Sequence, residues 1–247
     1  MTRSTSTTDR NHRITLVIPA FNEAGNIDAL VQESFDVLPE ALLGELIVVD
    51  DCSTDDSTGR LAALRARHPR LRVLRHTANA GQSASVRSGV AAARFPLFAT
   101  PDGDGQNPPG DIPALVAAYD PAGPQLVGGV RAKRRDTWSK RTASRLANAL
   151  RRRVLRDDCP DTGCGLKVFE RDRHLALPFF HGQHRYLPAL FRAYGASTAY
   201  VPIGDRARRH GASNYTNWKR GLQGIPDLMG VRWLVMRARP ARTEEIL

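Results

Sequence analysis

Four short apolar segments, each followed by a segment with helical spacing, restrict the fold of this chain more than any other feature. The four span residues 14–18, 46–49, 71–74 and 97–100. They are rich in β-branched residues and bounded by polar residues, Pro or Gly, which is typical of buried strands. Strands and helices in alternation form a mainly parallel sheet with helices on both faces. The sequence therefore predicts an α/β fold with a ligand crevice beyond the carboxyl ends of the strands.

Beyond Pro109 the alternation is less regular. We expect a helix over residues 112–119, a further strand over 125–130 and a long Arg-rich helix over 137–155. No internal repeat or low-complexity linker interrupts the sequence, which predicts one catalytic domain. The segment 1–13 is polar and lacks the apolar run of a signal peptide, so we expect a flexible tail there.

The charge balance points to anionic partners. The chain has 36 Lys and Arg residues against 25 Asp and Glu, a formal net charge of +11. This excess favours phosphates, nucleic acids or acidic lipid headgroups without choosing among them. The three cysteines form no CxxC pair and have no His at zinc-finger spacing, so they fit a reducing cytosol. No stretch approaches the roughly 18 uninterrupted apolar residues that a membrane-spanning helix needs.

Polar side chains follow the end of each of the four predicted strands. In chain order they are Asn22 and Glu23, Asp50 and Asp51, Asn79, and Asp102 and Asp104. Because the carboxyl ends of parallel strands meet at one edge of a sheet, we expect these side chains to line one crevice.

The segment 102–109, with the sequence DGDGQNPP, is the sharpest of these features. Two carboxylates one residue apart in extended backbone share a face, and hard oxygen ligands suit Mg²⁺ or Mn²⁺ bridging a diphosphate. Gln106 adds a third oxygen ligand. Flanking glycines let the backbone approach a ligand closely. A Gly-Asp turn is common in any loop. It is the position of this motif after a buried strand that favours a functional role.

The acidic pair after the second strand suggests a nucleoside pocket. Ser53 and Asp55 are explained as N-cap residues of the next helix, but the adjacent acids Asp50 and Asp51 exceed what a cap requires. A carboxylate accepts hydrogen bonds from a uracil imide or from a guanine edge. Because the sequence has neither GxxxxGK[ST] nor GxGxxG, we expect metal and basic residues to hold a nucleotide.

Seven segments, in this order, resemble the signature of family 2 glycosyltransferases, and in particular the polyprenyl-phosphate sugar transferases similar to dolichol-phosphate mannosyltransferase. They span residues 18–23, 48–55, 79–81, 102–109, 161–169, 184–190 and 208–215. An ordered set of this kind is specific where a single motif is not. The resemblance implies a Rossmann-like fold of GT-A type, with a mixed, mainly parallel sheet flanked by helices.

The resemblance also implies roles for individual residues. For the donor nucleotide these are Pro19, Phe21, Asn22, Glu23, Val49, Asp51, Asn79, Gly103 and Arg208. The residues implied to bind the cation are Asp102, Asp104 and Gln106, and those implied to act in catalysis are Asp102, Asp104 and Arg131. Since guanidinium and ammonium groups hold phosphate, the acceptor phosphate is expected at Arg131, Arg135, Lys167, Arg185 and Arg208.

Some positions depart from the family pattern. Cys52 stands where Gly is common, Gly103 and Gly105 replace the more frequent Ala and Leu, and Asn214 replaces a frequent Lys. The pair of C-terminal membrane helices found in many bacterial relatives is absent, which weakens an expectation of permanent membrane residence. His184, before an apolar helix, is interpreted as a structural histidine.

The predicted activity is metal-dependent, inverting transfer of a sugar from a nucleoside diphosphate donor to a polyprenyl (undecaprenyl or dolichyl) phosphate. A phosphate monoester is ionised near pH 7, because its second pKa is about 6, so this acceptor needs no general base. We predict a catalytic domain over 14–218 and an amphipathic helix and tail over 219–247. The segment 221–237 either contacts a membrane surface or packs on the core. The expected location is the cytoplasmic face of the membrane, as a peripheral protein.

Three alternatives remain open at this stage. A nucleic-acid-binding protein fits the net charge of +11, but interleaved aromatic residues and a recognition motif are missing, so we expect no nucleic acid partner. A family 2 transferase acting on a sugar hydroxyl would need a base that the sequence does not identify. An inactive relative kept as a scaffold is the third. The donor sugar, the nucleobase and the oligomeric state are not predicted.

Overall fold

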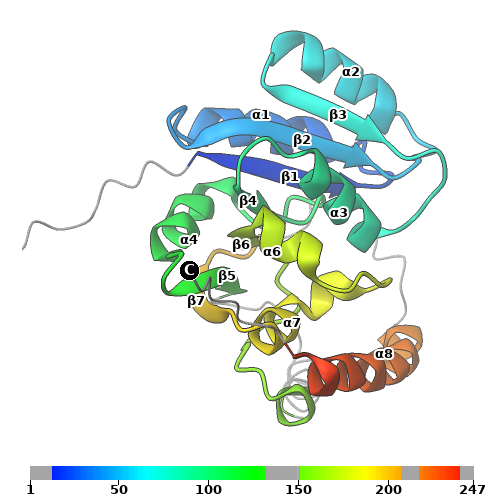
Figure 1. Ribbon diagram of the computed structural model, residues 1–247. Helices are drawn as coiled ribbons and strands as arrows, with labels where there is room; N and C mark the ends of the chain where they lie inside the picture. The colour runs from blue at the N-terminus through cyan, green and yellow to red at the C-terminus, as the bar shows by residue number, and fades with distance from the viewer. Residues whose placement is uncertain (1–12, 132–148, 150, 207–216, 240–247) are drawn as a thin grey trace, which may run out of the picture.

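The structure, a computed structural model, describes residues 13–131, 149, 151–206 and 217–239. Within these ranges one mixed sheet has the strand order β3-β2-β1-β4-β6-β5-β7. Its strands are β1 (Ile14–Ala20), β2 (Leu43–Asp50), β3 (Leu71–Arg75), β4 (Leu97–Thr100), β5 (Pro124–Arg131), β6 (Lys167–Glu170) and β7 (Ser197–Ile203). The flanking helices are α1 (Ile27–Val37), α2 (Ser57–Arg67), α3 (Gln82–Ala92), α4 (Ile112–Ala118), α6 (Arg171–Ala176), α7 (Leu187–Ala193) and α8 (Asn217–Arg237), with 3₁₀ turns η1 (Pro109–Asp111) and η2 (Gln183–Arg185). The predicted fold class is confirmed (Figure 1).

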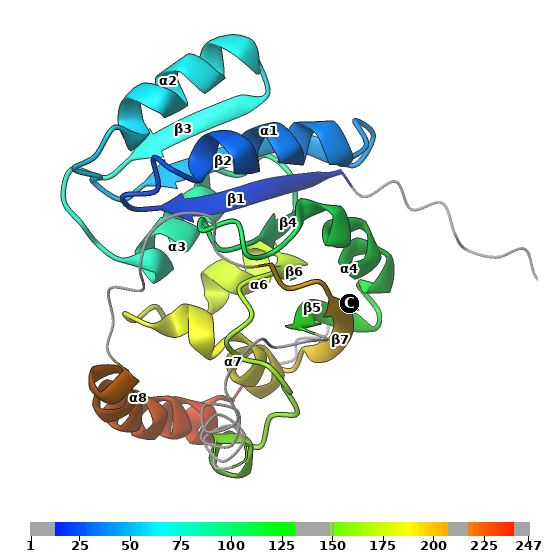
Figure 2. The same ribbon diagram turned by 180° about the vertical axis from the view of Figure 1, so that it is seen from behind.

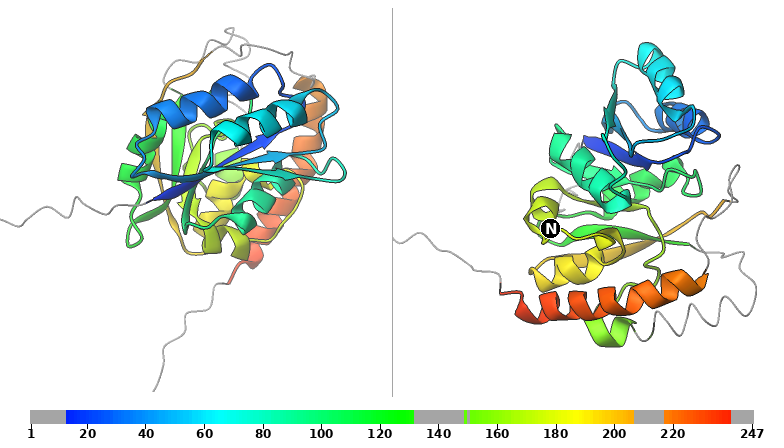
Figure 3. Two further views of the ribbon diagram at one scale, coloured as in Figure 1. Left: turned by 90° about the horizontal axis from the view of Figure 1, so that it is seen from above. Right: turned by 90° about the vertical axis from the view of Figure 1, so that its right-hand side faces the viewer.

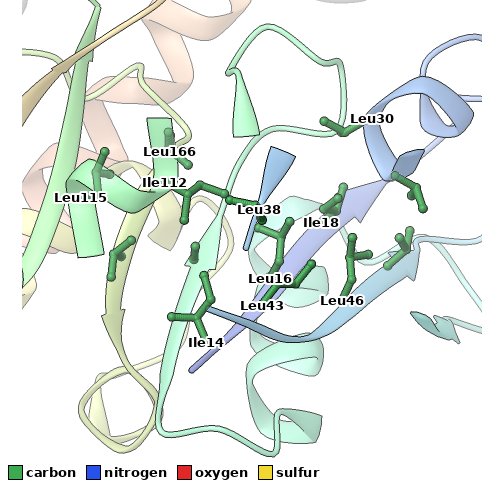
Figure 4. Close-up of a cluster of buried hydrophobic side chains, with 14 of the residues drawn as sticks. Ile14, Leu16, Ile18, Leu30, Leu38, Leu43, Leu46, Ile112, Leu115 and Leu166 are labelled. Atoms are coloured by element: carbon green, nitrogen blue, oxygen red, sulfur yellow. The ribbon is translucent and has the colours of Figure 1, made fainter. Parts of the chain in front are cut away.

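The first four strands pair in parallel and are the four predicted from the sequence. β1 is buried along its whole length and lies between β2 and β4. Its residues alternate between the two faces of the sheet: Ile14, Leu16 and Ile18 join the core under α1, α2 and α4, whereas Val17 joins the core under α3, α7 and α8. Figure 4 shows the first of these cores, with Ile112 and Leu115 of α4 beside the strand residues.

The sheet changes direction at β6, which pairs antiparallel with both β4 and β5. Thr100 at the end of β4 lies opposite Lys167 at the start of β6. The chain entering β6 therefore meets the chain leaving β4 at the same edge. β5 ends at this edge too, because it also runs antiparallel to β6.

Strands β6 and β7 were not predicted from the sequence. β6 has only four residues and begins with a buried Lys. β7 is an edge strand that is mostly half-exposed, so it lacks the continuous apolar run that identified the other strands. The predicted strand at 125–130 corresponds to β5, and the predicted helix at 112–119 to α4.

Helix α8 packs on α7 at the end of the molecule opposite α2 (Figure 3, right). Within the described ranges, no helix is both long enough and apolar enough to cross a membrane. Of the predicted helix at 137–155, residues 149 and 151–155 are described and are helical, and the rest lies outside the described residues. Residues 1–12 of the predicted tail over 1–13 also fall outside them, and the predicted boundary at 218/219 falls inside α8. The domain limits stay predictions.

Candidate active site

Asp102 follows β4, and Gly103 and Asp104 lie in a turn rather than in the extended backbone expected from the sequence. The backbone of Asp102 donates to Asn107 Oδ1 at 3.4 Å, and Asp104 Oδ1 accepts from the backbone of Gln106 at 3.1 Å. Gly103 lies against β1, where an added Cβ would be 2.4 Å from the Pro19 carbonyl oxygen. This close approach bends the loop back over the sheet edge, so Gly103 serves the packing of the loop.

The Asp102 carboxyl group is held from two sides. Gln82, at the start of α3, donates its side-chain amide to Asp102 Oδ1 at 2.8 Å. Gly165 lies on the other side, and a Cβ there would be 2.2 Å from Asp102 Cγ. Burial raises the pKa of Asp102, and the nearby charge of Asp104 raises it further, against the opposing effects of Lys167, Gln82 and Arg131. The two carboxylates are thus close enough to repel each other.

These carboxylates fit a divalent cation. Mg²⁺ and Mn²⁺ prefer oxygen ligands, and a protein often supplies one or two carboxylates while substrate phosphates and water complete the coordination. Neutralising two crowded carboxylates removes the repulsion that raises the pKa of Asp102. Among the described residues no group of three or more His, Cys, Asp or Glu side chains gathers at metal-binding distance. Two carboxylates with substrate phosphates and water are a ligand set that such a cation accepts.

Basic residues of β5 and β6 face the acidic loop. Arg131, the last residue of β5, forms a two-pronged ion pair with Asp161 at 2.8 and 2.9 Å, which raises the pKa of Arg131. Lys167 is buried, and its ammonium group donates to the Cys164 carbonyl oxygen. Both cations, predicted to hold the acceptor phosphate, already have partners within the chain. That role stays a prediction for both.

Asp51, predicted to face the nucleobase, organises the loop between β3 and α3. Its carboxylate accepts hydrogen bonds from the backbone of Ala80 at 2.9 Å and of Gly81 at 2.7 Å. His76 Nδ1 lies 2.6 Å from the same group, and Asn79 donates to the Asp51 carbonyl oxygen at 3.2 Å. The buried carboxylate thus fixes the chain that leads into α3 and to Gln82.

The loop after β1 is tied to the loop after β2. Asn22, at a φ of 56°, accepts from the backbone of Thr54 at 2.8 Å and donates its own backbone N–H to Ser53 Oγ at 3.0 Å. Asp55 accepts from the backbone of Ala24 at 3.0 Å. Asp55 also accepts from the backbone N–H of Ser57, the first residue of α2, at 3.0 Å, which agrees with a capping role for Asp55. Ser53 lies too far before α2 to cap it, and its side chain joins the two loops.

The other predicted site residues are spread along the same edge. Pro19 and Val49 are buried in the sheet, whereas Phe21 and Asn79 are exposed. Backbone N–H of Glu23 donates to Ser57 Oγ at 3.0 Å. Gln106 donates to the Arg206 carbonyl oxygen at 3.4 Å, and Arg185 lies in η2. Arg135 and Arg208 lie outside the described residues.

Four residues at this edge were not singled out from the sequence. They are His76, Gln82, Asp161 and Gly165. Asp161 and Gly165 stand in a segment that carried the resemblance, and Gln82 follows the Asn-Ala-Gly segment at 79–81, but no pattern in the residues showed what they touch. His184 accepts or donates a hydrogen bond with Ser83 at 2.7 Å, which agrees with its interpretation as structural.

Comparison with known proteins finds a matching family and similar proteins. A family model, Glycosyl transferase family 2, matches residues 15–175. An undecaprenyl-phosphate 4-deoxy-4-formamido-L-arabinose transferase of Edwardsiella ictaluri (strain 93-146) is 32% identical over 221 residues, covering 87% of this chain and 65% of the relative. The chain thus spans slightly less than two thirds of the length of this relative.

Two solved structures share the fold. Glucosyl-3-phosphoglycerate synthase from Mycobacterium tuberculosis, in complex with Mn²⁺, UDP-glucose and phosphoglyceric acid, has a TM-score of 0.70 at 24% identity, over 94% of this chain and 86% of that one. Mannosyltransferase PcManGT from Pyrobaculum calidifontis, in complex with GDP-Man and Mn²⁺, has a TM-score of 0.68 at 21% identity, over 93% of this chain and 66% of that one. Both support the GT-A fold expected from the sequence.

Proposed function

The chain belongs to glycosyl transferase family 2, and from that premise we propose that it transfers a sugar, with inversion, from a nucleoside diphosphate sugar to a polyprenyl phosphate. The curated relative at 32% identity is named for undecaprenyl phosphate and a sugar. The observation that carries the proposal is the carboxyl edge of the sheet, where Asp102 and Asp104 meet the basic residues Lys167 and Arg131. Acids there suit a metal-bound diphosphate, and cations suit an acceptor that is itself a phosphate.

A divalent cation, Mg²⁺ or Mn²⁺, would be held by Asp102 and Asp104, with Gln106 as a further oxygen ligand. When bound, it supplies positive charge beside the diphosphate that leaves the sugar. Both structural neighbours contain Mn²⁺ with a sugar nucleotide. Gln82 supports this assignment, because its hydrogen bond at 2.8 Å fixes one oxygen of Asp102 before any ligand arrives.

The basic side of the edge would hold the acceptor phosphate for attack on the sugar from the face opposite the diphosphate. The charges of Lys167 and Arg131 act on Asp102 and partly oppose the rise that burial causes in its pKa, so a phosphate near these cations would be close to the donor. The acceptor phosphate is ionised at neutral pH, so no residue has to remove a proton from it. The ion pair with Asp161 orients the Arg131 guanidinium group for this role.

Peripheral contact with the cytoplasmic membrane face completes the proposal. Helix α8 has one face on the core, through Val231, and the opposite face carries exposed apolar side chains. The exposed side chains are Ile225, 59%, Met229, 68%, Trp233, 58%, and Met236, 69%. With a helical repeat of 3.6 residues these positions form one stripe, and the exposed Arg232 and Arg237 flank it. A stripe of this kind is typical of helices that lie on anionic membranes.

The proposal is tested by product formation. The protein is incubated with a panel of UDP- and GDP-sugars, Mg²⁺ or Mn²⁺, and polyprenyl phosphates, and the organic phase is examined by mass spectrometry. We expect one nucleotide sugar to give a glycosyl phosphate lipid that forms only with a divalent metal. Transfer to free sugars or glycolipid hydroxyl groups, with no lipid phosphate product, would show the hydroxyl-acceptor activity instead.

A further inference from the structure

An apolar groove lies between α8 and the segment that precedes η2. Its volume is about 460 Å³, within the range of pockets that bind small organic ligands. Phe179 and Phe180 line one wall, and Pro226, Gly230, Trp233 and Leu234 of α8 line the other. Phe179 is half-exposed, so the groove opens to the surface beside the stripe on α8. Trp233 belongs both to this groove and to the stripe.

The groove is connected to the active site by a short run of contacts. Asp227 of the groove lies against Gly182, where an added Cβ would be 3.4 Å from its carboxyl oxygen. Two residues later His184 is hydrogen-bonded to Ser83 of α3. The neighbouring Gln82 holds Asp102. Figures 1 and 2 show the same order in space, with the segment before α7 reaching out between one end of α3 and α8.

Two cationic side chains lie over aromatic rings that line the groove. The guanidinium carbon of Arg87 lies 5.3 Å from the centre of the Phe179 ring, and that of Arg237 lies 5.7 Å from the Trp233 ring. A ligand suited to this surface has a hydrocarbon part for the groove and a negative charge for its surroundings.

We propose that the groove binds isoprene units of the acceptor chain next to its phosphate, while the rest of the chain stays in the membrane. The inference rests on the proposed function and adds to it a binding site for the hydrocarbon. The groove opens beside the α8 stripe, so an isoprenoid can enter it from a membrane surface without crossing open water. The loop that contacts Asp227 of the groove also contacts Ser83, the neighbour of the residue that holds Asp102.

Two glycines of α8 give a matched pair of variants. An added Cβ meets no atom within 4 Å at Gly230 or at Gly224, but only Gly230 lines the groove. Gly230→Phe should fill the groove and Gly224→Phe should not. A glycine inside a helix destabilises it by roughly 0.5–1 kcal/mol relative to Ala. Because both variants remove such a glycine, we expect both to fold. Circular dichroism melting curves check this, and Gly230→Leu serves as a smaller replacement in the same place.

The first readout is kinetic. The kcat/KM ratio for geranylgeranyl phosphate over dimethylallyl phosphate, which has a single isoprene unit, is measured for each protein. We expect Gly230→Phe to lower this ratio by roughly tenfold or more, with Gly230→Leu in between and Gly224→Phe at the wild-type value. Equal ratios in the two Phe variants would overturn the proposal.

The second readout does not depend on catalysis. A farnesyl phosphate that carries a diazirine is photo-crosslinked to the full chain, and the labelled peptides are mapped by mass spectrometry. We expect labels within residues 178–180 and 226–234, and their loss in Gly230→Phe. Groove labelling without any transferase product would support isoprenoid binding in the groove and refute the proposed function. Transfer with labels elsewhere would refute the groove. Equal labelling of the groove by a diazirine fatty acid would show that it binds membrane acyl chains rather than isoprenoids. Self-association that is lost in Gly230→Phe would show that a second copy of the chain occupies it.

Discussion

At the scale of single residues, the site depends on Gly165 having no side chain. The carboxyl group of Asp102 occupies the space that a side chain at residue 165 would need, with its Cγ 2.2 Å from an ideal Cβ position. Real Cβ atoms do not approach other atoms that closely, so even a methyl group would force the carboxylate to move. Gln82 would then lose its hydrogen bond to Asp102, and the cation would lose an aligned ligand.

Gly165→Ala should therefore lower turnover by about 100-fold, the loss that a displacement near 1 Å can cause. The measurement is kcat for lipid glycosylation, with folding checked by circular dichroism. Gly110→Ala is the control, because an added Cβ at Gly110 meets no atom within 4 Å. If the two alanine variants turned over at the same rate, Asp102 would not need its present position.

From the sequence we could identify those site residues that are recognisable by residue type and local position alone. Asp102 and Asp104 were found because paired acids follow a buried strand, and the structure places them together. Gly165 and Gln82 act through contacts with Asp102 across 63 and 20 positions of the chain. Local sequence patterns carry no information about such contacts, so these residues could not be predicted.

At the scale of elements, α6 carries a buried histidine that makes folding sensitive to acid. His174 packs against Phe98 and Phe169, with ring centres 5.8 and 5.2 Å away. Neither ring nitrogen has a hydrogen-bond partner among the described residues. Burial, with a smaller effect from the positive charge of Arg87, lowers the pKa of His174 to about 4. The folded protein therefore keeps this ring neutral where an unfolded chain would protonate it.

A depressed histidine pKa contributes stability that is present above the unfolded value near 6.5 and is lost as the pH falls toward 4. From pH 7 to pH 5 we expect His174 to cost about 2 kcal/mol of the free energy of unfolding. His174→Phe should remove that part of the loss, as measured by urea denaturation at both pH values. His68→Phe, at a partly exposed ring stacked on Phe35, should retain it. The same acid loss in both variants would contradict this account.

Elements were predictable to the degree that they carried their own signal. β1, β2 and β4 are apolar runs that are buried almost throughout, β5 is buried in its middle and β3 is mostly half-buried, and all five were expected. β6 and β7 are held by pairing with neighbouring strands, and their four and seven residues show no comparable run. For α8 the sequence left two alternatives, membrane or core, because the pattern shows apolar residues on more than one face. Packing on α7 assigns one face to the core.

At the scale of the whole molecule, the site lies where two halves of the sheet meet. The parallel half, β3-β2-β1-β4, supplies the loops that carry Asp51 and Asp102, and the antiparallel strand β6 brings Lys167 to the same edge. The second half also carries the groove and α8. A ligand that bridges acids of one half and cations of the other should therefore stabilise the whole fold.

The most direct test of this account is the melting temperature of the protein with a nucleoside diphosphate and Mn²⁺. A ligand at about 100 times its Kd stabilises the folded state by ~2.7 kcal/mol, or roughly 5–10 °C for a chain of this size. We predict that rise with UDP or GDP only when the metal is present, and its loss in the Asp102→Ala, Asp104→Ala double variant. A rise of the same size without metal, or one retained by the double variant, would contradict the assignment of these carboxylates to a metal-bound diphosphate.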